Sequence, residues 1–143
     1  MPVKNVELQT IEARRFSRID EKPQQLRIDH NSTVRSITEV NDKEANIEFT
    51  YTSTFGALGM IRLEGKIVYE GDAPAISREW MTNHKMPDAI ASEIHTAVMH
   101  ICVPEAVFLS RELRLPPPIP LPQVNFQKAP QEQSKPKSSP EVA

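Results

Sequence analysis

The chain has 143 residues, of which 38% are hydrophobic and 25% charged, and its formal net charge is −2. This balance is typical of one soluble globular domain. The slight acidity disfavours nucleic acid as a partner. Only four glycines disfavour a glycine-rich phosphate-binding loop, and a single cysteine excludes an internal disulfide, which suits a reducing compartment.

The N-terminus carries no targeting pattern. Its first sixteen residues, MPVKNVELQTIEARRF, contain no apolar stretch of the kind that a signal peptide requires. No run of eighteen apolar residues occurs anywhere in the chain. We therefore expect a cytoplasmic protein with no membrane partner.

The first half of the chain predicts β-strands. In residues 45–55, apolar or small residues alternate with polar ones over eleven positions, which is the period of a half-buried strand. Residues 61–69 alternate in the same way, and Gly56 and Gly59 lie between the two runs. The pattern predicts an antiparallel hairpin. Weaker alternation around Val6 and over residues 26–40 predicts further strands, with a turn at Asn41.

Helical spacing replaces this alternation after residue 70. Either Asp72 or Ser77 is placed to cap a short helix that carries Ile76 and Trp80. A longer helix opens at Pro87, and we expect it to bend near Pro104 and to end at residues 116–118, Pro-Pro-Pro. The residues that we expect it to bury are Ile94, Val98, Ile101, Val107 and Phe108. Strands followed by helices predict an α+β fold, with the helices on one face of an antiparallel sheet.

Eight of the thirteen prolines fall in residues 116–143. Residues 127–143 contain one β-branched aliphatic residue, Val142, and no aromatic residue. Such a segment buries too little apolar surface to offset the loss of chain entropy. We therefore predict a folded domain over residues 1–126 and a disordered tail over 127–143.

No catalytic or metal site is predicted. His95 and His100 are five residues apart, whereas two ligands on one helix need a spacing of three or four, and His30 and His84 lie elsewhere. Cys102 shares the apolar stripe of the long helix, which favours a buried, inert thiol. Motifs for nucleophilic serine, phosphate loops and dinucleotides are absent from the sequence. We expect a protein that is not an enzyme and that needs no cofactor or metal.

The proline-rich segment 114–122 leaves two interpretations open. Arg114, Pro117 and Pro120 fit the spacing of ligands for SH3-type domains, which bind polyproline II segments. That interpretation predicts an interaction scaffold. The apolar residues that continue to Phe126 favour the other interpretation, an extended segment packed along the domain.

The C-terminal half resembles the SecB family of protein-export chaperones. Residues 102–112, CVPEAVFLSRE, are similar to a helix motif of that family, and residues 120–126, PLPQVNF, are similar to its closing segment. The matching positions are Pro104, Val107, Phe108, Arg111, Glu112, Leu121, Val124, Asn125 and Phe126. An aromatic third strand that contains Phe49 and Tyr51 agrees with the family's order of strands before helices.

Three departures favour a divergent SecB-like branch, such as the archaeal type, over the export chaperone itself. Val103 separates the cysteine from the proline, and only residues 113–115 stand where a second family helix would follow. Residues 72–89 resemble an insertion before the main helix. We therefore expect the second helix to be reduced.

The resemblance implies a four-stranded antiparallel sheet with helices on one face, assembled as a homo-oligomer, either a dimer or a tetramer. The implied activity is the ATP-independent holding of unfolded or pre-export polypeptides in hydrophobic grooves. Translocation machinery is an implied partner, although the tail lacks the Cys/His signature for docking a translocation ATPase. Aromatic and methionine side chains at strand ends and in the insertion are the expected groove residues, namely Tyr51, Phe55, Trp80 and Met86.

Overall fold

The computed structural model describes residues 3–18 and 27–119. The closing segment 120–126 and the predicted tail 127–143 lie outside these residues. Four strands are followed by two helices, in the order β1 (Val3–Arg15), β2 (Asp29–Asn41), β3 (Glu44–Thr54), β4 (Gly59–Glu70), α1 (Ala73–Asn83) and α2 (Asp88–Glu112).

The strands form one antiparallel sheet in the order β1-β4-β3-β2. Phe49 lies opposite Gly65 in the β3–β4 pair, which confirms the predicted hairpin. Gly56 in its turn has a φ of +59°, a conformation that glycine adopts without a steric penalty. The turn predicted at Asn41 joins β2 to β3. Because β1 adds to the far side of β4, the two edges of the sheet are β1 and β2.

Both edge strands contain β-bulges. The pairing of β1 with β4 shifts register between residues 3 and 5 and again between 8 and 10. The pairing of β2 with β3 shifts between residues 34 and 36 and again between 39 and 41. The longest edge stretches without a shift are therefore residues 10–15 on β1 and 29–34 on β2.

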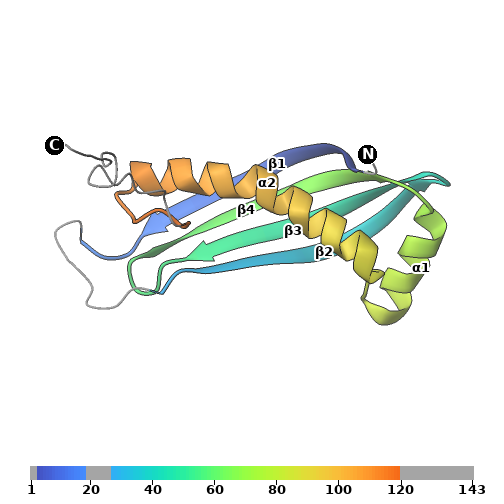
Figure 1. Cartoon of the computed structure of the whole chain (residues 1–143), viewed down its shortest axis with the longest axis horizontal. Coiled ribbons are helices and arrows are strands. Elements are labelled where there is room, and N and C mark those ends of the chain that lie inside the picture. Colours follow the sequence, from blue (N-terminus) through green and yellow to red (C-terminus); the bar gives the residue numbers. More distant parts are fainter. Residues whose placement is uncertain (1–2, 19–26, 120–143) are drawn as a thin grey trace, which may run out of the picture.

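The helices cover one face of this sheet. Figure 1 shows α2 running diagonally across the strands, with α1 at the end of the sheet from which α2 starts. Alternate side chains of β3 and β4 are buried beneath α2, including Ile47, Phe49 and Leu63. The predicted α+β class, with helices on one face of a four-stranded antiparallel sheet, is confirmed.

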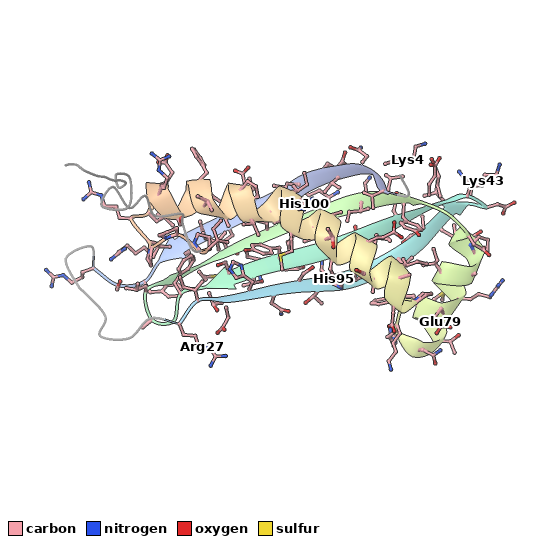
Figure 2. All side chains as sticks on the ribbon, in the orientation of Figure 1. Lys4, Arg27, Lys43, Glu79, His95 and His100 are labelled. Atoms are coloured by element: carbon pink, nitrogen blue, oxygen red, sulfur yellow. The ribbon has the colours of Figure 1, made fainter. Side chains whose placement is uncertain are left out.

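The other face of the sheet is charged. Glu12 on β1 accepts a hydrogen bond from Arg62 on β4 at 2.8 Å. Near the start of β1, Lys4 contacts Glu44 at 3.1 Å and Glu70 at 3.2 Å, and these carboxylates raise the pKa of the lysine. Figure 2 shows Lys4 at this end of the molecule. The apolar side chains of β3 and β4 therefore lie mainly on the helical face.

The side of α2 that packs on the sheet differs from the prediction. Ile94 and Val98 are buried as expected, but Ile101 and Phe108 are 41% and 54% exposed, and Val107 is only partly buried. The buried stripe continues instead through small residues, Cys102, Ala106 and Ser110. Small side chains let the helix lie close to the sheet, and Phe108 is two residues from Ala106, which turns it to the opposite side. The expectation that Phe108 is a core residue is wrong.

Pro104 does not end α2, which continues as one helix to Glu112. The expected bend at this residue stays a prediction. Between Glu112 and residue 119, the last described residue, no further helix follows α2. The expected reduction of the family's second helix stays a prediction.

Candidate functional site

Two grooves flank α2 on the helical face of the sheet. The first, which we name the β1 groove, has a volume of about 410 Å³ and lies between β1 and α2. Its lining residues include Val3, Val6, Thr96, Ala97, His100 and Ile101. The second, which we name the β2 groove, has a volume of about 460 Å³ and lies between β2 and the helices. Its lining residues include Ser32, Val34, Trp80, His84, Met86 and His95.

Helix α1 positions Trp80 at the β2 groove. The Asp72 side chain caps the helix by accepting a hydrogen bond from the Ala75 backbone N–H at 3.2 Å, which satisfies one of the otherwise unpaired donors of the first turn. Buried Ile76 fixes the helix against the core. The helix ends at His84, whose left-handed backbone turns the chain toward α2. The ring of His84 stands edge-on to that of Trp80, with 5.7 Å between their centroids.

A hydrogen bond connects α2 to β2 within the β2 groove. Nδ1 of His95 lies 2.7 Å from the hydroxyl oxygen of Ser32. Figure 2 shows His95 on α2 on the side that faces the strands. This bond fixes the separation of α2 from the edge strand, and it therefore helps to set the width of the groove.

The four expected groove residues separate into two pairs. Trp80 and Met86 are partly exposed and line the β2 groove together. Tyr51 and Phe55 are fully buried in the core. The Tyr51 hydroxyl lies 2.6 Å from Nδ1 of His30, and burial raises the pKa of Tyr51 to about 12. Tyr51 and Phe55 are therefore not on the surface of either groove.

The family-motif positions are only partly within the described residues. Pro104, Phe108, Arg111 and Glu112 are exposed on α2 and do not line either groove. Leu121, Val124, Asn125 and Phe126 lie outside the described residues.

Sequence reasoning missed His95 and the β1 groove. The spacing of Ala91 and His95 places both on one side of a helix, but only the chain path shows that this side faces β2. Likewise, Val6 was an expected strand residue, but its position beside α2 depends on the pairing of β1 with β4.

The described part of the chain holds no group of three or more His, Cys, Asp or Glu residues that could bind a metal ion. Within residues 3–18 and 27–119, no helix is long and apolar enough to cross a membrane. The helical face of the sheet instead contains the two partly apolar grooves, one beside each edge strand.

Comparison with family models and with curated proteins finds no match. Comparison with solved structures finds a similarity to the SecB-like chaperone Rv1957 of Mycobacterium tuberculosis, in complex with a ChAD peptide from the HigA1 antitoxin Rv1956. The TM-score is 0.58 at 12% sequence identity, over 86% of this chain and 88% of that one. This neighbour is bacterial, and the comparisons give no support to the archaeal-type branch. The sheet and its helices therefore have the fold of a SecB-like chaperone.

Proposed function

We propose that this protein is an ATP-independent holdase of the cytoplasm, which binds unfolded or pre-export polypeptides in its hydrophobic grooves and is not an enzyme. One observation carries the proposal: Trp80 and Met86 line a groove of about 460 Å³ beside the edge strand β2. The fold supports it, since a protein of the same fold binds a peptide from a partner protein.

The residues of the β2 groove suit an unfolded client. A tryptophan buries a large apolar area in a contact, and a methionine adapts its shape to different side chains. A holdase needs such contacts and no catalytic group, because binding only non-native chains lowers the concentration that is free to aggregate. We propose the β2 groove as the primary client site.

The alternative, a scaffold that docks a partner through residues 114–122, is less well supported. Within the described part of this segment, Leu115 and Pro118 are buried, as expected of a segment packed along the domain. Of the contacts expected for an SH3-type ligand, Arg114 is exposed, Pro117 is partly buried and Pro120 lies outside the described residues. The neighbouring Leu115 and Pro118 would have to leave the core before the segment could be bound in this way.

We expect the protein to suppress aggregation of a client without ATP. The test is light scattering by chemically denatured citrate synthase diluted into buffer, with the protein at near-stoichiometric ratios. Trp80→Ala removes the aromatic wall of the β2 groove and should raise the amount of protein needed severalfold. The matched control is Met81→Ala, because Met81 is adjacent on α1, is 74% exposed and does not line either groove.

Trp80 is the only tryptophan of this chain, so its fluorescence reports on the groove when the client contains no tryptophan. Reduced, carboxymethylated ribonuclease A, a tryptophan-free unfolded client, should shift the emission of Trp80, and native ribonuclease A should not. If the wild type leaves scattering unchanged, the holdase proposal is wrong. If Trp80→Ala protects as well as the wild type, the β2 groove is not the client site.

We also propose a homo-oligomer. Large apolar side chains are exposed on and beside β1 (Ile11, Phe16) and on α2 (Ile101, Phe108), a surface that a second copy would cover. Sedimentation at micromolar concentration should give a mass at least twice the 16.2 kDa of one chain. Phe108→Asp should shift it toward the monomer, whereas Val40→Asp, at an equally exposed site on β2, should not. A strictly monomeric wild type would contradict the proposal.

A further inference from the structure

The chain turns back onto the sheet directly after α2. Arg114 adopts a left-handed backbone with a φ of +54°, and the Leu115 N–H donates to the Ser110 carbonyl at 2.8 Å. This hydrogen-bond pattern closes the C-terminal end of a helix and reverses the chain direction. Figure 1 shows the segment leaving the end of α2 toward the strands. We name residues 113–118 the strap.

Side chains from the two edge strands hold the strap. Arg15, opposite Gly59 near the end of β1, donates to the carbonyl oxygens of Leu113 at 3.2 Å and Arg114 at 2.8 Å. At the other end, Nε2 of His30 on β2 lies 2.5 Å from the carbonyl oxygen of Pro118. A carbonyl oxygen only accepts, so Nε2 of His30 donates this hydrogen bond, while Nδ1 of the same ring contacts the Tyr51 hydroxyl at 2.6 Å.

The positions of these anchors show what the strap covers. His30 lies opposite Ser53 on β3, and Arg15 lies opposite Gly59 on β4, so the strap spans the sheet from edge to edge at this level. Phe55 is at the same end of the sheet, and Tyr51 is bonded to one of the anchors. Leu115 of the strap is buried in the same core cluster as both aromatic residues. The strap therefore closes the apolar end of the sheet.

The strap can leave without disrupting the strands. Residues 116–118 are prolines and have no N–H to donate to a strand. Among the described residues, the backbone hydrogen bonds of the strap go to α2 and none goes to the sheet. Its attachment consists of the two anchors and the buried side chains of Leu115 and Pro118.

We infer that the strap is a displaceable cover over a second client surface, formed by Tyr51 and Phe55, and that strap closure competes with binding of an extended apolar polypeptide. This inference rests on the proposed holdase function. Residues 115–118 of the strap are apolar (Leu-Pro-Pro-Pro), and the strap is fixed through its carbonyl oxygens, so it occupies this surface as an apolar client segment would. Weakening either anchor raises the fraction of open molecules, and the apparent client affinity rises by the same factor.

The test compares Arg15→Gln and His30→Ala with the wild type. The matched control is Arg14→Gln, because Arg14 is adjacent, is exposed, and pairs with Glu12 instead of the strap. The client is reduced, carboxymethylated α-lactalbumin, which stays unfolded. We expect each anchor variant to bind it about threefold to tenfold more tightly, with Arg14→Gln unchanged. Trypsin should cleave each anchor variant after Arg114 faster than it cleaves the wild type, by a similar factor. Excess client should accelerate the same cleavage in the wild type.

The outcomes separate this inference from the function on which it rests. Far-UV circular dichroism identifies a variant that fails to fold, in which case the other anchor variant decides the matter. If the wild type binds the client and a folded anchor variant binds it no more tightly, the strap is not a cover, while the holdase proposal stands. If no chain binds the client, both proposals are overturned.

Discussion

Phe49→Ala should lower the free energy of unfolding by about 3–5 kcal/mol. Phe49 is fully buried in β3, which lies between two other strands. Its ring lies over Gly65 on β4, where an added Cβ would stand 2.8 Å from the ring. Because glycine has no side chain to move into the space left by the ring, the substitution leaves a cavity. Chemical denaturation followed by circular dichroism measures the loss.

Phe108→Ala is the comparison, since it removes the same atoms from a side chain that is 54% exposed. It should cost less than about 1 kcal/mol, as expected of a surface site. Both variants should be measured at a protein concentration low enough to keep the chain monomeric, because Phe108 belongs to the proposed subunit contact. Similar losses for the two variants would contradict the described orientation of α2.

The native Cys102 thiol should react with Ellman's reagent about 10³-fold more slowly than the thiol of the unfolded chain at pH 8. Burial of the thiol, with a smaller contribution from the Glu105 carboxylate, raises the pKa of Cys102 from 9.0 to about 12. The reactive species is the thiolate, and three pKa units reduce its population about a thousandfold. The rate of absorbance change on mixing gives the measurement.

The unfolded control is the same protein in 6 M guanidinium chloride, where its thiol should react with the rate of an ordinary cysteine. Ala106→Gly provides a second comparison, because it loosens the same side of α2 without touching the thiol and should speed the native reaction. A native rate close to the unfolded rate would show that the side of α2 bearing Cys102 does not face the sheet.

The strands were predictable because their hydrophobic pattern is local. Ile47 and Ile67 belong to alternating runs that only a half-buried strand explains, and the turn between the runs contains glycine. The packing side of α2 was not predictable in the same way. The rule that large apolar residues lie inside predicted that Phe108 packs on the sheet. The helix instead lies close to the sheet, and the small residues Ala106 and Ser110 are the ones that are buried there.

The candidate site was predictable only where the local sequence distinguishes a groove residue from a core residue. Trp80 and Met86 stand out in the sequence because they lie in a segment between the sheet and the long helix, and the structure places them in one groove. The alternation around Tyr51 is compatible both with a buried core position and with an exposed position at a strand end. In the structure Tyr51 is buried in the core. The anchors Arg15 and His30 gave no sequence signal, because their partners are backbone carbonyl oxygens more than eighty residues away.

The bulges of β1 and β2 bear on the solubility of the protein itself. A sheet with two long, regular edges can stack edge to edge without limit, which is how fibrils grow. Here each edge offers at most six consecutive residues in register, 10–15 on one side and 29–34 on the other. Edges interrupted in this way permit short pairings with another chain but resist continuous ones. The bulges therefore limit how far copies of this chain can pair continuously along their sheet edges.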